Sequence, residues 1–368
     1  MRVQIIAKPG STTSGTSRHA SELYQGLQKL GDEVSMVAPS LHPLLRLPSR
    51  LAKPIGIDLE AFFASYPIYV SLEAADVYHI VTQTMATLLS RHFPAPVIVT
   101  VHDIIPYIVR NDPKLNTLGH IVDRGFYHQA IRWLDRADAL VAVSEYTKST
   151  LIEYLQIPAE KIHVVYNSVD LQRFRPLNVP DEFRQKYQLP ADQPYILYVG
   201  SEDPRKNLPT LLRAFTRVKQ QFPKIKLIKA GTGHFPARRR ELVELTQQLK
   251  IDQDVLFLDT VPEADLPLLY NAADLVVMPS LYEGFGYPVI EALACGKPVT
   301  CANTSSLKEL AAIGGCLTFD PLDEDDMADK LEQTLMHSLP NRPADLSCFA
   351  SEAVMRSMQQ VYHTLESV

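Results

Sequence analysis

The chain of 368 residues is about twice the usual length of a single domain, so two domains are expected. Its composition, 46% hydrophobic and 21% charged residues, is that of an ordinary globular protein, and its formal net charge of −6 argues against broad nucleic-acid binding, which requires a basic surface. The sequence contains no apolar run long enough to span a membrane and no signal-peptide core at its N-terminus, so a cytoplasmic protein is expected. The cysteines form no C-x-x-C pair, which favours buried, reduced thiols over disulfides or a zinc site. They are Cys295, Cys301, Cys316 and Cys348.

The first half of the chain predicts alternating strands and helices. An apolar run at Val3–Ala7 is followed by a small-residue loop over Pro9–Ser17 and by helical spacing of apolar residues over Arg18–Leu30. Ser144 is the expected N-cap of a helix over Glu145–Leu155. Repeated units of this kind with continuous apolar strands indicate a parallel sheet covered on both faces. The other predicted strands are Val34–Ala38, Asp76–Ile80, Val97–His102, Ala139–Val143 and Lys161–Tyr166.

The alternation restarts after a proline-rich segment, Arg175–Pro194, which we interpret as an interdomain linker. Two doubly wound domains, 1–176 and 190–348, are therefore expected, followed by a last helical stretch from about Phe349. Ligands of such sheets bind at the carboxyl ends of the strands, so the predicted site is the cleft between the domains. The elements predicted for the second domain are Tyr195–Val199, Leu208–Gln221, Lys226–Ala230, Arg238–Lys250, Val255–Leu258, Leu275–Met278 and Pro298–Cys301.

Two strand ends in the first domain carry candidate binding residues. The loop containing Gly15 and Thr16 lacks the lysine of a phosphate-binding NTPase loop and does not match the dinucleotide motif. Its small residues at a helix N-terminus suit either close approach of a substrate or a plain turn. His102 and Asp103 directly follow a strand, where the imidazole is either a hydrogen-bonding partner of a sugar hydroxyl or a structural histidine fixed by Asp103.

Two segments of the second domain carry the strongest chemical signals. Arg205 and Lys206 follow the first strand at the start of a helix, where they suit a diphosphate, although such a pair alone is commonly just solvated. Farther along, Glu283 and Glu291 lie eight positions apart around a glycine-rich turn. The turn would let backbone N–H groups face an anion, and the two carboxylates would accept hydrogen bonds from sugar and ribose hydroxyls.

The segment from Glu283 to Glu291 is similar to the E-x7-E motif of the family four nucleotide-sugar glycosyltransferases, which have the GT-B fold. Further blocks of this sequence match that family in the same order. Besides the small-residue loop before Arg18, these are V-T-V-H-D (99–103), V-S-E-Y-T-K (143–148), V-Y-N-S-V-D (165–170), V-G-S-E-D-P-R-K-N-L (199–208), K-A-G-T-G (229–233) and A-A-D-L-V-V-M-P-S (272–280).

The resemblance implies specific roles. It places the diphosphate on Arg205 and Lys206, the donor hexose on Glu283, and the ribose on Glu291. It places His102 against the donor sugar from the opposite domain, and it implies that the helix at about 349–368 crosses back onto the first domain. Many family members have an arginine directly after Gly200, where this chain has Ser201. The remaining residues that it implies are Gly200, Thr260, Val261, Gly284, Phe285 and Gly286 for donor binding, with Thr260 and Val261 beside the base, and Gly15, Thr16 and Asp103 on the acceptor side.

The function implied is retaining transfer of a hexose, mannose or glucose, from a nucleotide-diphosphate sugar to a glycan or lipid-linked acceptor, with no cofactor and no metal. The D-x-D pattern within 323–326 is interpreted as a helix start rather than a metal site. Leu44–Lys53, within the variable region 41–57 expected to govern acceptor choice, mixes apolar and basic residues. It suits either peripheral contact with the inner face of a membrane or a partly packed loop. The alternatives are a sugar-binding or nucleotide-sugar-binding protein and a sugar-nucleotide epimerase.

Overall fold

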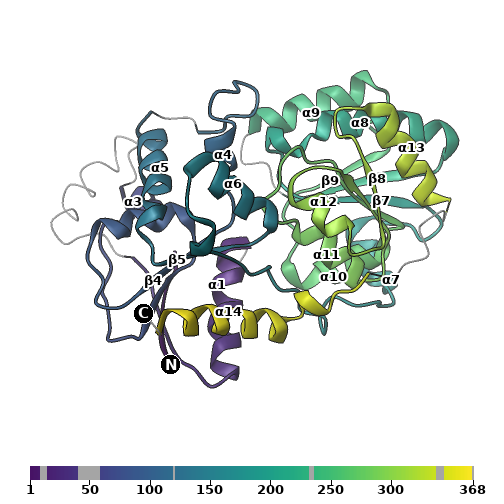
Figure 1. Cartoon of the computed structure of the whole chain (residues 1–368). Coiled ribbons are helices and arrows are strands. Elements are labelled where there is room, and N and C mark those ends of the chain that lie inside the picture. The colour runs from purple at the N-terminus through teal and green to yellow at the C-terminus, as the bar shows by residue number, and fades with distance from the viewer. Residues whose placement is uncertain (9–14, 40–58, 119–120, 232–235, 337–343, 367–368) are drawn as a thin grey trace. The chain divides into compact units, whose positions relative to one another are not determined.

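The computed structural model describes residues 1–8, 15–39, 59–118, 121–231, 236–336 and 344–366. The chain divides into two compact units, each of which is built around its own sheet (Figure 1). The first unit comprises Met1–Ser168 together with Ser351–Val368, and the second comprises Val169–Ala350.

The first unit holds a six-stranded parallel sheet within the described residues, in the order β2-β1-β3-β4-β5-β6. The strands are β1 (Arg2–Ile6), β2 (Glu33–Val37), β3 (Val77–Ile80), β4 (Val97–Val101), β5 (Ala139–Ala142) and β6 (Ile162–Val164). The helices are α1 (Gly15–Lys29), α3 (Leu59–Ser65), α4 (Ile105–Ile108), α5 (Ile121–Trp133), α6 (Glu145–Leu155) and α14 (Ser351–Glu366). Short 3-10 turns are η3 (Gln83–Ser90), η4 (Leu134–Arg136) and η5 (Ala159–Lys161).

Side chains on both faces of this sheet are buried, which explains why its strands are continuous apolar runs. Ile5 packs on one face with α1 and α14, and Ile6 packs on the other face with α5 and η3. The predicted strands and the helix after the first loop are confirmed, although α1 begins three residues before the predicted start. Ser144 accepts a hydrogen bond from the Thr147 backbone N–H at 3.0 Å, which confirms it as the N-cap of α6.

The C-terminal helix α14 belongs to the first unit, as predicted, and packs beside α1 (Figure 1). A buried hydrogen bond fixes it there: the hydroxyl of Tyr362 lies 2.7 Å from Nδ1 of His79 on β3. The other ring nitrogen of His79 lies 2.7 Å from the Thr100 hydroxyl on β4. Both ring nitrogens are therefore occupied, and this histidine joins two strands to the returning helix.

The second unit holds a six-stranded parallel sheet within the described residues, in the order β12-β11-β10-β7-β8-β9. Its strands are β7 (Tyr195–Val199), β8 (Lys226–Ala230), β9 (Val255–Leu258), β10 (Leu275–Met278), β11 (Val299–Ala302) and β12 (Cys316–Phe319). Its helices are α7 (Asp181–Tyr187), α8 (Leu208–Gln221), α9 (Pro236–Gln248), α10 (Leu266–Ala272), α11 (Tyr287–Ala294), α12 (Ser305–Ala311) and α13 (Glu324–Leu335). The 3-10 turns are η6 (Pro204–Lys206), η7 (Glu263–Asp265) and η8 (Ser347–Phe349).

The strand order of the second unit reverses between β7 and β10. Strands β7, β8 and β9 extend in one direction, and β10, β11 and β12 extend in the other. In doubly wound sheets the crevice at such a reversal binds ligands, because the connections after the two central strands separate there. The loops after β7 and β10 are therefore where this fold provides a site.

Three details differ from the sequence predictions. The proline-rich segment contains the helix α7, which begins after Pro180, and the strand β12 was not predicted. The cysteines are free, but only Cys295 and Cys301 are fully buried, whereas Cys348 is exposed. Among the described residues, none of the helices has the length and apolar character needed to cross a bilayer.

The stability of the first unit is expected to fall as the pH drops below about 6.5. Burial, and secondarily the nearby His102, lower the pKa of His79 to about 3. Above pH 6.5 this ring is neutral in both states, but below it only the unfolded chain takes up the proton, at a cost of up to about 1.4 kcal/mol per pH unit. Denaturation at pH 6.5, 5.5 and 4.5 should show a shallower decline for His79→Gln. Equal slopes for the two proteins would contradict this assignment.

Candidate functional site

The loop after β7 places two cations at the reversal point of the second sheet. Asp203 begins the short turn η6 by accepting a hydrogen bond from the backbone N–H of Arg205 at 3.1 Å. Asn207, in the left-handed conformation with φ of 58°, then redirects the chain into α8. The Asn207 side chain donates to the carbonyls of Pro279 and Pro321, at 3.2 and 2.7 Å. The loop is thereby tied to the segments that follow β10 and β12.

The loop after β10 supplies the facing carboxylate, and a glycine lets it turn. Gly286 has φ of +118° and precedes α11. A Cβ there would meet side chains of Leu307 and Leu310 at 3.0 and 3.1 Å, so both the backbone conformation and the space favour glycine. Glu283, three residues earlier, is 6% exposed. The glycine-rich turn thus lets a buried carboxylate be placed directly before a helix.

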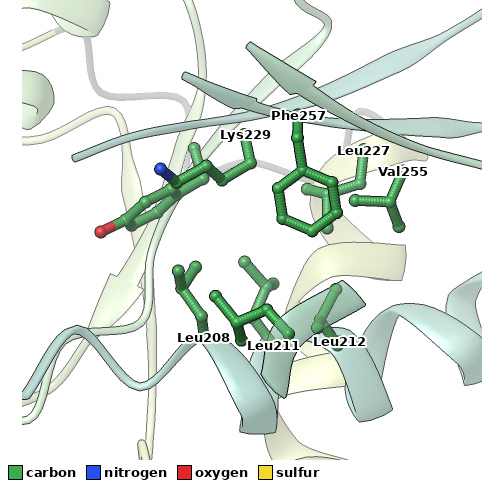
Figure 2. Close-up of a pocket in the computed structure, with 9 residues that line it drawn as sticks. Leu208, Leu211, Leu212, Leu227, Lys229, Val255 and Phe257 are labelled. Atoms are coloured by element: carbon green, nitrogen blue, oxygen red, sulfur yellow. The ribbon is translucent and has the colours of Figure 1, made fainter. Parts of the chain in front are cut away.

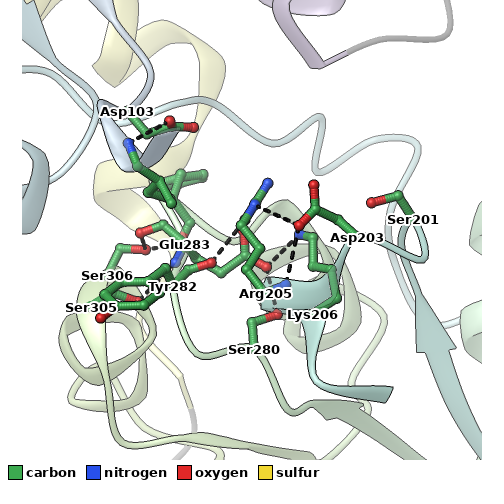
Figure 3. Close-up of polar contacts among 12 residues, drawn as sticks. Asp103, Ser201, Asp203, Arg205, Lys206, Ser280, Tyr282, Glu283, Ser305 and Ser306 are labelled. Atoms are coloured by element: carbon green, nitrogen blue, oxygen red, sulfur yellow. Dashed lines mark hydrogen bonds and ion pairs between the residues drawn. The ribbon is translucent and has the colours of Figure 1, made fainter. Parts of the chain in front are cut away.

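The two loops bring Arg205, Lys206 and Glu283 together, as Figure 3 shows. One carboxylate oxygen of Glu283 lies 2.5 Å from the Lys206 ammonium and also accepts from the Ser280 hydroxyl at 2.7 Å. The other oxygen lies 3.1 Å from the guanidinium of Arg205, which also donates to the Tyr282 carbonyl at 2.8 Å. Residues nearly 80 positions apart therefore form one charged cluster.

The cluster is ionised and sets two cations against two carboxylates. Burial alone would raise the pKa of Glu283, but Lys206 and Arg205 overcome it and lower that pKa to about 2. Burial also lowers the pKa of Lys206, with Arg205 acting in the same direction and Glu283 opposing. Glu283 faces both cations, and the carboxylate of Asp203 lies 3.8 Å from Arg205 at the edge of the cluster, so the charges balance.

The loop after β11 completes the support of this carboxylate. Ser305 accepts a hydrogen bond from the Glu283 backbone N–H at 2.9 Å. The Ser306 hydroxyl lies within hydrogen-bond distance of the carbonyl oxygens of Glu283 and Phe285, at 3.0 and 2.6 Å. These two serines and Ser280 were not predicted from the sequence. Their signal was available, because residues 304–306 lie just after the carboxyl end of β11, where ligand-binding residues are expected.

The other predicted donor residues lie in the same unit but make different contacts. Glu291, on α11, is 3% exposed and accepts a hydrogen bond from the Tyr270 hydroxyl at 2.7 Å. Gly200 directly follows β7, and a Cβ there would lie 2.5 Å from the hydroxyl of Tyr198. Thr260 and Val261 follow β9 and are exposed and half-buried, respectively. The structure thus joins Glu283 to the cation pair, while Glu291 is held by a neighbouring helix.

Of the residues predicted in the first unit, His102 is held by a backbone carbonyl and lies beside another histidine. His102 follows β4, with Nε2 at 2.9 Å from the carbonyl of Val81, and the His19 ring of α1 lies edge-on to it with centroids 5.1 Å apart. A carbonyl only accepts, so His102 carries its proton on Nε2. Asp103 does not hold this ring, because its carboxylate accepts instead from the backbone N–H of Ile105 at 3.0 Å. Burial lowers the pKa of His102.

Some predicted positions have a simpler outcome or lie outside the described residues. Asp323 caps α13 by accepting from the N–H groups of Asp325 and Asp326, at 2.9 and 3.0 Å, which confirms the helix-start interpretation. Thr16 lies in the first turn of α1, which begins at Gly15. The segments Leu44–Lys53 and 41–57 lie outside the described residues.

Comparisons with known proteins match both halves of the chain. Residues 179–348 match the family model "Glycosyl transferases group 1", and residues 13–173 match "Glycosyltransferase Family 4". O-antigen chain mannosyltransferase B of Escherichia coli is 35% identical over 209 residues, which cover 55% of this chain and 52% of that protein. The chain therefore spans about half the length of that curated relative.

Solved structures match the fold over nearly the whole chain. Sucrose-phosphate synthase from Thermosynechococcus elongatus superposes with a TM-score of 0.75 and 21% identity, covering 100% of this chain and 99% of that one. The Anabaena protein HepE, in complex with UDP-glucose, superposes with a TM-score of 0.69 and 20% identity, covering 100% of both chains. At this level of identity the likeness shows the fold alone.

Proposed function

The chain belongs to the group 1 glycosyltransferases of family four, which have the GT-B fold, and from this premise we propose that it transfers a hexose from a nucleotide-diphosphate sugar to an acceptor. The proposed donor carries mannose or glucose, since the similar Escherichia coli protein is a mannosyltransferase and HepE was solved with UDP-glucose. The proposed acceptor is a glycan or a lipid-linked glycan.

One observation carries the proposal: two cations and one buried carboxylate converge at the strand-order reversal of the second sheet. A departing nucleoside diphosphate develops negative charge on its terminal phosphate oxygens. Cations that are already held in place stabilise that charge without rearranging during the reaction, which is usually the largest single contribution to such catalysis. Arg205 and Lys206 are held this way by Glu283, Tyr282 and Asp203.

Glu283 has a double role in this proposal. Each of its oxygens already contacts a cation, so the carboxylate anchors Arg205 and Lys206 before any ligand arrives. Its remaining lone pairs are proposed to accept hydrogen bonds from hydroxyls of the donor hexose. The carboxylate faces hydroxyls rather than phosphate, because direct contact with phosphate would be repulsive.

We propose that the configuration at the anomeric carbon is retained by displacement on one face of the sugar. The bond from the anomeric carbon to the diphosphate oxygen breaks and its electrons leave with the diphosphate. The acceptor oxygen then bonds to that carbon and transfers its proton to a phosphate oxygen of the leaving group. Arg205 and Lys206 stabilise the diphosphate throughout. Since these two cations supply that charge, transfer is expected to persist in EDTA.

In this proposal the first unit binds the acceptor, and Gly15, Thr16 and Asp103 lie on the acceptor side. The lone pair on Nδ1 of His102 follows from the Nε2 contact with the Val81 carbonyl. His102 is therefore proposed to accept a hydrogen bond from a sugar hydroxyl rather than to donate one. Contact of Leu44–Lys53 with an anionic membrane remains part of the proposal. It can be tested by liposome flotation of the protein in which Arg46, Arg50 and Lys53 are replaced by serine.

The proposed activity is tested by incubating the protein with a panel of UDP, GDP and ADP sugars and candidate acceptors while recording release of the nucleoside diphosphate. Release that depends on an acceptor is expected with at least one donor. A thermal-shift series with the same nucleotides identifies the base, because a ligand that binds only the native state raises its melting temperature. Binding without release would favour a sugar-binding protein, and conversion of the donor to a different nucleotide sugar would indicate an epimerase.

A further inference from the structure

A second charged cluster lies beside the cation pair, and the proposed reaction does not use it. Glu202, in the loop after β7, has a side chain that is 1% exposed. One of its oxygens lies 2.7 Å from the Lys229 ammonium on β8 and 2.5 Å from the Arg239 guanidinium on α9. The side chain of Lys229 is 2% exposed, and it also donates to the Gly231 carbonyl. Glu202 therefore serves two cations inside the second unit.

Hydrophobic surroundings make this cluster costly. Lys229 lies beside a small apolar pocket, with Leu208, Leu211 and Phe257 among its lining side chains (Figure 2). Burial lowers the pKa of Lys229, and Glu202 opposes that shift. Desolvating two charges costs several kcal/mol per ion, so a buried pair of this kind is weak evidence for a purely stabilising role. Its geometry suggests a different purpose.

Arg239 extends the cluster to a third strand end. Its guanidinium lies 2.8 Å from the Asp259 carboxylate, directly after β9, and stacks over the Phe257 ring with 4.9 Å to the centroid. The Asp259 side chain is 72% exposed, so this contact contributes little to stability. Together with Glu202 and the Phe257 ring, it places the guanidinium between the two loops. Arg239 thus joins the loops after β7 and β9, between which β8 lies.

The backbone brings the same three strand ends together. Gly231, with φ of +112°, donates its N–H to the carbonyls of Leu258 and Asp259, at 3.1 and 2.9 Å. A Cβ on Gly231 would lie 2.5 Å from the Gly200 carbonyl oxygen, so the loops after β7 and β8 meet without space for a side chain. The backbones of these loops are therefore already in contact, and the ion cluster adds contacts between their side chains.

These loops carry both halves of the proposed nucleotide site. Arg205 and Lys206, proposed for the diphosphate, follow Glu202 by three and four residues, and Thr260, proposed beside the base, directly follows Asp259. We propose that Arg239 is a positioning residue that, through Glu202 and Asp259, sets how the loop with the diphosphate contacts and the loop with the base contacts are oriented toward each other. This inference rests on the proposed function. It predicts that the cluster affects the affinity for ligands that contact both loops, and that it does not affect the affinity for ligands that contact only one of them.

The test compares a ligand that uses both loops with one that uses only the cation pair. Binding of UDP, GDP and ADP, and of inorganic pyrophosphate, is measured by calorimetry for the parent protein and for Arg239→Met, which keeps a stem to pack on Phe257. Affinity for the nucleoside diphosphate that binds the parent protein should fall about tenfold, because the two halves of the site no longer hold the two ends of one ligand together. Affinity for pyrophosphate should stay unchanged. For transfer, the donor KM should rise while kcat is largely retained.

Two further variants keep the test decisive. Arg239→Lys keeps the positive charge for folding but cannot reach both carboxylates, so its binding should resemble that of Arg239→Met. Arg238→Met, which removes an exposed contact to Glu241, should bind like the parent protein. The inference is overturned if Arg239→Met binds all ligands normally, or if it loses pyrophosphate and nucleoside diphosphate equally. If the parent protein itself binds no nucleoside diphosphate, the proposed function fails instead.

Discussion

Replacing Glu283 by glutamine is expected to lower the rate of sugar transfer by about 100-fold or more, because catalysis of this kind depends on charges held in place beforehand. The amide keeps the shape but loses the charge that holds Arg205 and Lys206. Burial and Arg205 lower the pKa of Lys206, whereas Glu283 raises it. Because the variant loses the charge of Glu283, the pKa of Lys206 should fall further. The loss of activity should therefore grow as the pH is raised. Initial rates over a pH series measure both effects.

A control and a mechanistic outcome belong to the same experiment. Glu324→Gln removes a carboxylate that is 46% exposed and pairs with Arg213, and it should leave the rate unchanged. Mass spectrometry of the parent protein after exposure to donor without acceptor should show only the unmodified chain. A covalent glycosyl-enzyme would contradict displacement on one face, and a parental rate would contradict the role of the cation pair.

Replacing Glu202 by glutamine is expected to destabilise the second unit by about 3–5 kcal/mol, the usual cost of removing one partner from a buried ion pair. Lys229 and Arg239 would then share a buried region without their common counter-charge. Lys229→Met should cost less than about 1.5 kcal/mol, since methionine suits the apolar pocket and Glu202 keeps Arg239 as its partner. The two partners of this ion pair are thus expected to give unequal losses of stability when each is replaced.

Denaturation in guanidinium chloride measures this asymmetry. Glu241→Gln, which removes an exposed partner of Arg238, serves as the control and should change stability by less than about 0.5 kcal/mol. Equal destabilisation by Glu202→Gln and Lys229→Met would indicate that the pair acts as a unit and that Arg239 does not compensate Glu202.

The sequence predicted the parts of the fold that depend on local pattern. Apolar runs such as Val97–Val101 are strands because both of their faces are covered, and Ser144 is recognisable as a cap from its position before a helix. The helix α7 was missed because its segment is rich in proline, although Pro180 precedes the helix, where proline does no harm. Local composition alone did not distinguish a helix start from a linker.

The sequence named the three ionic members of the site but not how they are joined. It assigned Arg205 and Lys206 to one ligand and Glu283 to another part of it, whereas the structure pairs them directly. That pairing, like the Glu202 contact with Lys229, depends on strand order, which no residue pattern states. Ser305 and Ser306 could have been suspected from their place after a strand, but their contacts with the backbone of the Glu283 loop depend on the same strand order.

The close meeting at Gly231 has a consequence for redesign of this protein. Because a methyl group there would collide with the backbone of Gly200, the position offers no usable diversity in a combinatorial library. Attempts to change the nucleotide of the proposed activity are better directed to Thr260 and Val261, which are proposed to lie beside the base, follow β9 and are not fully enclosed. The junction of the three strand ends therefore leaves no room for substitution, and adaptation of the proposed site to a new base has to come from the residues around it.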